Sequence, residues 1–228
     1  MASTTVPVIT LPRPAVMRQW MAQYHVPAVG IGLVTGDRIT SKVYGELSKG
    51  IPAPQNTVWG SKDLANVLAT IHKIEYKKTD SLPFTDLFAE LDMPDTTLGD
   101  PIKVLNRMAR PHNKRDGIYV FKPYDTDGHV FTTISDLCKL LTHVTHQTNL
   151  ISLPYKVTET DKKYGWRQLY NSSGDYQGIM HSAAGNGASH VLLILAQSKQ
   201  AIIILTNSDN GQLVEQLILN QCCPDIML

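Results

Sequence analysis

The chain has 228 residues, of which 43% are hydrophobic and 18% are charged, and its formal net charge is +1. This length suits one sizeable domain, and we predict a single domain over residues 1–228. Because Lys and Arg are scattered and no apolar run approaches the roughly 20 residues of a membrane helix, nucleic acid and membranes are excluded as main partners.

The first third of the chain predicts a helix, a β-hairpin and a second helix. The first helix opens next to Pro14, which suits the start of a helix, and the two strands flank the turn residues Gly36 and Asp37. The second helix has Asp63 near its start, where the helix dipole favours a carboxylate. The predicted ranges are 16–24 (helix), 26–34 and 38–44 (strands) and 63–75 (helix).

The rest of the chain predicts short helices followed by a run of strands. Strands that follow one another without crossover helices pair antiparallel. With helices at both ends, the fold class is α+β, an antiparallel sheet flanked by N- and C-terminal helices. The predicted ranges are 84–91 (short helix), 99–122 (mostly loop), 135–146 (helix), 164–170, 176–181, 189–196 and 201–206 (strands) and 212–220 (helix).

Short motifs in the same order resemble the serine β-lactamase-like family of class C β-lactamases, penicillin-binding DD-peptidases and related esterases. Residues 91–96 are similar to the family's "LGMKDT" segment, residues 129–137 to its "GGLxSTxxDL" segment, and residues 181–185 to its "H-[ST]-G" strand end. The other similar segments are residues 25–34, 43–47, 56–59, 164–166 and 205–209. The resemblance implies a β-lactamase/transpeptidase-like fold over nearly the whole chain.

The family's nucleophile motif, Ser-x-x-Lys, is changed in this chain. Aligned without gaps, Asp63 stands at the serine and Asn66 at the lysine. Ser61 does not restore the motif, because Lys62 follows it immediately and Leu64 is its fourth residue. Asp63 is interpreted either as a helix cap or as a catalytic carboxylate, and Lys62 either as a site cation or as a solvated surface residue.

The family's helical subdomain is predicted to be largely missing. In relatives it lies between the nucleophile helix and the "LGMKDT" segment and carries a Tyr-x-Asn motif. Only residues 73–89 remain for it here, and they contain no Tyr-x-Asn. Its loss should expose apolar surface along the sheet and the nucleophile helix, which favours a homodimer.

The resemblance also implies which groups would form a site. The oxyanion hole would use the backbone amides of Asp63 and Ala184. His181 and Ser182 are interpreted as an active-site edge, or alternatively as an idle strand end. Tyr124 is a candidate hydroxyl acid or base, or else an aromatic anchor of a loop.

Three functions follow as hypotheses. The first is a divergent enzyme that acts on a small molecule by isomerase, cyclase or hydrolase-type chemistry, with Trp59 and Asn66 contacting the substrate. The second is a serine hydrolase that uses Ser61, and the third is a catalytically dead binding module. No cofactor and no metal is predicted, and the few cysteines and the N-terminus without a secretory pattern favour the cytoplasm.

Overall fold

The computed structural model describes residues 9–75, 84–115, 118–121, 129–146, 166–195, 198–224 and 226–227. Its centre is an eight-stranded sheet whose neighbouring strands are all antiparallel, in the order β13-β9-β10-β11-β12-β1-β2-β3. The strands are β1 (Ala28–Thr35), β2 (Arg38–Ser48), β3 (Ile51–Pro52), β9 (Trp166–Asn171), β10 (Tyr176–Gly185), β11 (Ala188–Leu195), β12 (Gln200–Thr206) and β13 (Ile226–Met227).

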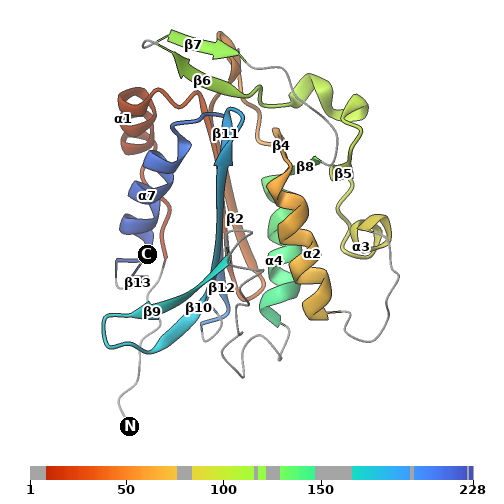
Figure 1. Cartoon of the computed structure of the whole chain (residues 1–228), viewed down its shortest axis with the longest axis vertical. Coiled ribbons are helices and arrows are strands. Elements are labelled where there is room, and N and C mark those ends of the chain that lie inside the picture. The colour runs from red at the N-terminus through yellow and green to blue at the C-terminus, as the bar shows by residue number, and fades with distance from the viewer. Residues whose placement is uncertain are drawn as a thin grey trace.

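Helices cover both faces of this sheet, which gives three layers (Figure 1). One face carries the first and last helices of the chain, and the other carries α2 and α4. The helices are α1 (Pro14–Tyr24), α2 (Asp63–Glu75), α3 (Phe84–Glu90), α4 (Ile134–His146) and α7 (Gly211–Cys222), with a 3-10 helix η1 at Ile102–Arg107.

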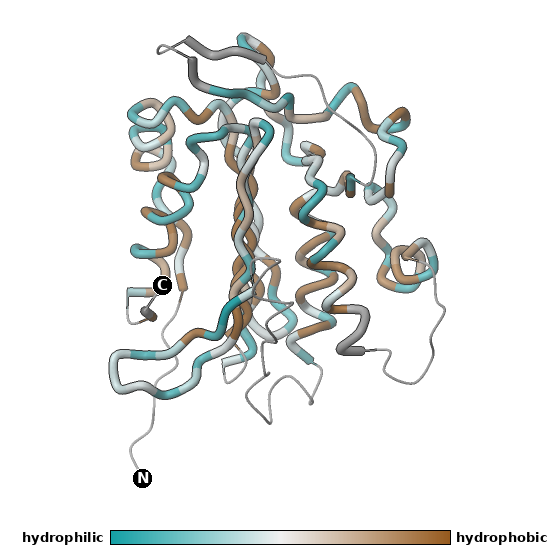
Figure 2. The backbone as a smooth tube through the Cα atoms, viewed as in Figure 1, coloured by the Kyte–Doolittle hydropathy of each residue, from teal (hydrophilic) through white to brown (hydrophobic). Residues whose placement is uncertain are grey.

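Two apolar cores lie on the two faces of the sheet, and the brown central strands of Figure 2 mark them. In β1 every residue but the last is buried, because strands covered on both faces need apolar side chains on both. Alternate residues therefore serve different cores: Val29 and Ile31 face α1 and α7, whereas Ala28 and Val34 face α2 and α4.

Two smaller sheets complete the fold. In a three-stranded sheet, β4-β8-β5, strand β4 leads into α2 and strand β8 leads into α4. A separate hairpin, β6-β7, lies at the top of Figure 1. Their strands are β4 (Val58–Ser61), β5 (Thr97–Leu98), β6 (His112–Arg115), β7 (Ile118–Phe121) and β8 (Val130–Thr133).

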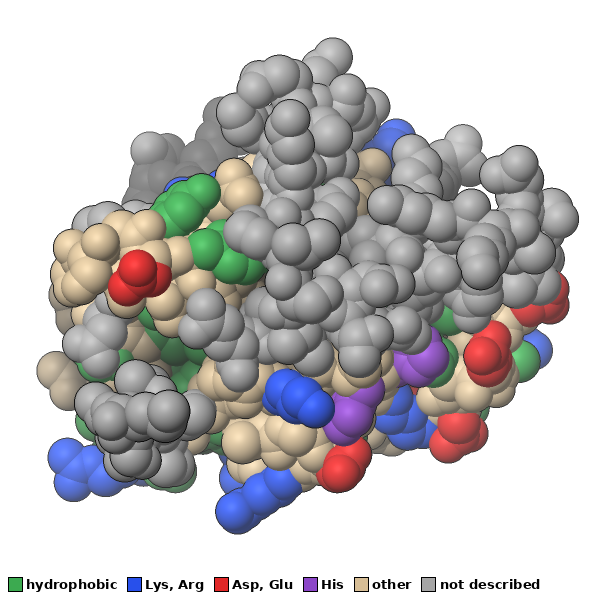
Figure 3. Space-filling view, turned by 90° about the horizontal axis from the view of Figure 1, so that it is seen from below, with side chains coloured by type: hydrophobic (Ala, Val, Ile, Leu, Met, Phe, Trp, Pro, Cys, Tyr) green, Lys and Arg blue, Asp and Glu red, His purple; other side chains and the backbone are tan. Residues whose placement is uncertain are grey.

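The predicted α+β fold class and the main elements are confirmed. The structure corrects three ranges: the segment predicted as mostly loop contains η1 and the β6-β7 hairpin, the strand that begins at Arg38 continues to Ser48, and the strand that begins at Tyr176 continues to Gly185. No helix in the described part of the chain is long and apolar enough to cross a membrane. Seen from below, acidic and basic side chains are interspersed on the described surface (Figure 3).

Candidate functional site

The start of α2 is held by a serine hydroxyl. Ser61 ends β4, and its Oγ accepts the backbone N–H of Asp63 at 3.2 Å. This bond satisfies one of the free amides at a helix N-terminus. The Asp63 amide, predicted as an oxyanion-hole donor, therefore has a partner in the chain itself.

The other predicted residues of this region divide between surface and interior. Asp63 is the first residue of α2 and Asn66 follows one turn later, both half-buried, whereas Lys62 is exposed. Trp59 is buried, with 3% of its surface exposed. The apolar face of α2 is also buried, through Leu64, Val67, Leu68 and Ile71.

The space between the start of α2 and the sheet is nearly filled. A cavity of about 10 Å³ lies there, lined among others by Trp59, Ser61, Leu64 and His190. A cavity of about 10–15 Å³ accommodates one water molecule. A substrate therefore finds no room beside Ser61 in this conformation.

His181 forms a buried pair with His190, a residue of β11 that the sequence analysis did not single out. Nε2 of His190 lies 3.0 Å from Nδ1 of His181, and the two rings stack with centroids 5.1 Å apart. Trp166 packs edge-on against His181, with ring centroids 5.0 Å apart. His181 and His190 are 0% and 1% exposed, so the predicted strand-end histidine is an interior residue.

Burial sets the protonation of His190. Desolvation, with the neighbouring His181 as a smaller cause, lowers the pKa of His190 to about 3. His190 is therefore neutral near pH 7 and binds a proton weakly. A general base works best with a pKa near the operating pH, so this burial weakens His190 as a base toward Ser61.

Ser182 lies on the opposite face of the sheet from His181, because adjacent residues of a strand alternate between faces. Its Oγ accepts a hydrogen bond from Nη2 of Arg167 at 3.3 Å. Ser182 also lines a cavity of about 260 Å³ beneath α7. Ala184 is exposed near the end of β10, and it is not among the residues that line the cavity beside Ser61.

A strand-turn signal could have located His190. Asn186 and Gly187 join β10 to β11, and both have positive φ, 54° and 81°, as a type I′ hairpin turn requires. That turn fixes the register in which His181 pairs with Leu192. His190 is then the diagonal neighbour of His181 on the same face.

Tyr124 and Tyr164 lie outside the described residues. The three cysteines are buried free thiols, and desolvation raises the pKa values of Cys138, Cys222 and Cys223 to about 12, 11 and 12. Such thiols are poor nucleophiles. Within the residues that the structure describes, no group of three His, Cys, Asp or Glu side chains is placed to hold a metal ion.

Solved structures share this architecture. The octameric penicillin-binding protein homologue from Pyrococcus abyssi matches with a TM-score of 0.65 and 10% identity, over 90% of this chain and 75% of that one. A β-lactamase/D-alanine carboxypeptidase from Pseudomonas syringae matches with a TM-score of 0.63 and 12% identity, over 92% of this chain and 97% of that one. For a class C β-lactamase from Rhodobacter sphaeroides the TM-score is 0.57 and the identity 11%, over 90% and 97% of the two chains. No family model and no curated protein sequence matches the chain.

Proposed function

Since the chain has the serine β-lactamase-like fold, we propose that it is a non-catalytic form of that fold which acts by binding. The observation that carries the proposal is the packing at the start of α2. The Ser61 hydroxyl accepts the first amide of α2, and the space between Ser61 and the sheet has room for one water. The groups that would carry acyl transfer thus serve the fold instead.

Charge supports the same conclusion. Acyl transfer develops an oxyanion, and the backbone donors that stabilise it must be free to point at it. Here the Asp63 amide is bonded to Ser61, and the Asp63 carboxylate stands where relatives place their serine. An anion at that position repels a second developing anion.

A serine hydrolase that uses Ser61 is the second candidate, and one observation favours it. Ser61 and His190 line the same small cavity, and His190 is hydrogen-bonded to His181. A serine with an imidazole base that a third group orients is the general pattern of an activated nucleophile. This candidate needs the start of α2 to move away from the sheet and the pKa of His190 to rise on opening.

Covalent labelling separates the two candidates. The protein is incubated with a fluorophosphonate and, separately, with a penicillin, and the intact mass is measured by mass spectrometry. We expect no adduct and no turnover of a chromogenic β-lactam or a p-nitrophenyl ester above buffer. Ser61→Ala should lower the free energy of unfolding by about 1 kcal/mol, because the Asp63 amide loses its hydrogen bond to the Ser61 hydroxyl.

An adduct that disappears in Ser61→Ala and persists in the control Ser173→Ala would overturn the non-catalytic proposal in favour of a Ser61 hydrolase. Turnover that Asp63→Ala abolishes would favour the divergent enzyme that uses Asp63. A cytoplasmic location, a single domain over residues 1–228 and a homodimer remain predictions. Size-exclusion chromatography with light scattering tests the homodimer.

A further inference from the structure

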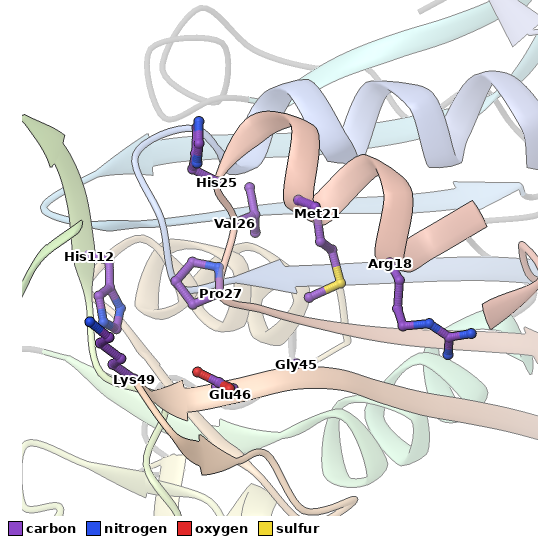
Figure 4. Close-up of a pocket in the computed structure, with 10 residues that line it drawn as sticks. Arg18, Met21, His25, Val26, Pro27, Gly45, Glu46, Lys49 and His112 are labelled. Atoms are coloured by element: carbon purple, nitrogen blue, oxygen red, sulfur yellow. The ribbon is translucent and has the colours of Figure 1, made fainter. Parts of the chain in front are cut away.

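A sizeable cavity lies away from the start of α2. It measures about 630 Å³, is partly open to solvent and is lined by residues of the C-terminal half of α1, the end of β2 and the start of β6 (Figure 4). Ligand cavities in proteins commonly measure about 300–1,000 Å³, so this one suits a drug-sized molecule.

The middle of the cavity is apolar. Met21, Val26 and Pro27 form its wall, and Figure 4 shows Met21 and Pro27 between the charged residues at its two ends. Gly45 lets Met21 and Pro27 pack directly against β2, because a Cβ there would lie 2.6 Å from Met21 Cε and would also meet the Pro27 carbonyl. An apolar body is the part of a ligand that this wall favours.

Cationic side chains stand at both ends. Figure 4 draws Arg18 at one end, and Lys49 beside His112 at the other. Neither Arg18 nor Lys49 forms an ion pair within the part of the chain that the structure describes. The one acidic lining residue, Glu46, accepts the Gly50 amide through Oε2 at 2.9 Å.

The helix end that borders the cavity does not reverse this charge balance. The last carbonyls of α1 are capped, because the N–H of Val26 donates to the Met21 oxygen at 2.9 Å and the N–H of His25 donates to the Ala22 oxygen at 3.4 Å. Capped carbonyls oppose an anion less than free ones do. The lining residues therefore include two side-chain cations, Arg18 and Lys49, and one carboxylate, Glu46.

We infer that this cavity binds an amphiphilic organic anion, a carboxylate or sulfonate carried on an apolar body. The inference names a ligand class for the binding role proposed above and rests on that role. The anionic group pairs with Lys49 or Arg18, and the apolar body covers Met21, Val26 and Pro27. Ala22, which is exposed and lines the cavity, stands where a larger side chain would fill it.

Two fluorescent probes with nearly the same aromatic body test the charge requirement. 8-Anilinonaphthalene-1-sulfonate carries an anion, and N-phenyl-1-naphthylamine does not. Fluorescence titration of the full chain should give one saturable site for the sulfonate, with at least tenfold weaker binding of the neutral probe. Affinity for the sulfonate should fall as salt is raised from 0.02 to 0.5 M.

Variants locate the site. Arg18→Met and Lys49→Met should each weaken the sulfonate at least fivefold and leave the neutral probe unchanged, whereas Ala22→Phe should abolish binding of both. Lys42→Met, which removes an exposed lysine of β2 that does not line the cavity, is the matched control. Circular dichroism and thermal melts identify any variant that fails to fold, and the two methionine variants with the salt series still decide the outcome.

Equal affinity for the two probes, or unchanged sulfonate binding in both methionine variants, would overturn the ligand class. Unchanged binding in a folded Ala22→Phe variant would overturn the site. The proposed function fails by a different measurement, the labelling of Ser61, so the two failures are told apart.

Discussion

The carboxyl group of Glu215 lies beneath α7 and is held by hydroxyl groups of the sheet. Its Oε1 accepts a hydrogen bond from Ser189 Oγ at 2.7 Å, and Ser189 Oγ lies 2.8 Å from Thr206 Oγ1. Burial raises the pKa of Glu215 from 4.5 to about 8, although the Ser189 bond opposes that shift. Folding therefore favours the protonated acid.

This pKa predicts a pH dependence of stability. The contribution of Glu215 is complete below about pH 4.5 and is lost as the pH rises to about 8, because the unfolded chain releases the proton more readily. In that window the free energy of unfolding of the wild-type protein should fall by up to about 1.4 kcal/mol per pH unit, and Glu215→Gln should remove this fall. Urea unfolding at several pH values measures it, with exposed Glu90→Gln as the control.

A Glu215→Gln profile parallel to that of the wild-type protein between pH 5 and pH 8 would contradict this account. His190 cannot imitate the effect. Its lowered pKa makes stability fall toward acid pH instead, and it is present in both proteins.

The sequence predicted the elements that carry these residues but not which side chains surround them. The apolar stripe of residues 212–220 predicted α7, and the same stripe contains Glu215, but the hydroxyls that accommodate its carboxyl come from β11 and β12. Strand alternation separates Ser182 from His181, so both could not face one site. The burial of His181 depends on Trp166 and His190, which only the strand pairing brings to it.

Between elements, α4 packs closely against β1. A Cβ on Gly30 would lie 2.7 Å from Ile134 Cγ1, and one on Gly32 would lie 2.8 Å from Ile203 Cγ2 and also meet Cys138 Sγ. The two glycines of β1 face α4 and let helix and strand approach. A methyl group at either position requires the neighbouring side chains or the helix itself to shift.

Gly32→Ala should therefore lower the free energy of unfolding by about 1–3 kcal/mol through overpacking. Combining it with Cys138→Ala, which removes the sulfur that the new methyl would meet, should recover part of that loss. A double-mutant cycle from urea unfolding measures the coupling. Strictly additive effects would show that α4 already yields to the extra methyl.

The start of α4 also joins two motif segments. The buried carboxylate of Asp136 accepts the Asp95 N–H and the Thr96 hydroxyl, each at 2.9 Å through Oδ2, and the Asp136 N–H donates to Thr133 Oγ1 at 3.1 Å. The segments that resemble "LGMKDT" and "GGLxSTxxDL" are thus in contact. These hydrogen bonds give the two segments a structural role, which is to hold the start of α4 against residues 95 and 96.

Asp136→Ala should lower the free energy of unfolding by about 2–3 kcal/mol, because it leaves the Asp95 amide and the Thr96 hydroxyl without their acceptor. Asp136→Asn keeps an acceptor oxygen and should cost less. The exposed Asp100 accepts the Ile102 amide, and Asp100→Ala is the control, with an expected change near 0.5 kcal/mol. Equal decreases in the free energy of unfolding for Asp136→Ala and Asp100→Ala would contradict this structural role of Asp136.

Periodicity predicted the long elements because each buries a continuous apolar face, as α4 does with Leu137, Leu140, Leu141 and Val144. The β6-β7 hairpin was missed for the opposite reason. His112–Arg115 is polar and has no alternation to read, and its partners are backbone groups elsewhere, such as the Gly187 and Asn207 carbonyls that accept the His112 amide.

Across the whole molecule, the free space beside the start of α2 differs from that beside α1. The α2/α4 face, where the resemblance places a catalytic site, is packed to within one water beside Ser61. The roomy cavity adjoins α1 at the end of β2. The fold could be predicted from ordered motifs, whereas the location of free space depends on how side chains from distant segments pack.

The pairing of β1 with β12 also governs how the chain can fold. Val29 pairs with Thr206, and the Asn207 side chain accepts the Ala28 amide at 2.7 Å. Most of the chain must therefore be synthesised before β1 can pair with β12 at the centre of the sheet. Contacts so distant in sequence slow folding. Until β12 is available, we expect the hairpin of β1 and β2 to expose an apolar edge that chaperones bind.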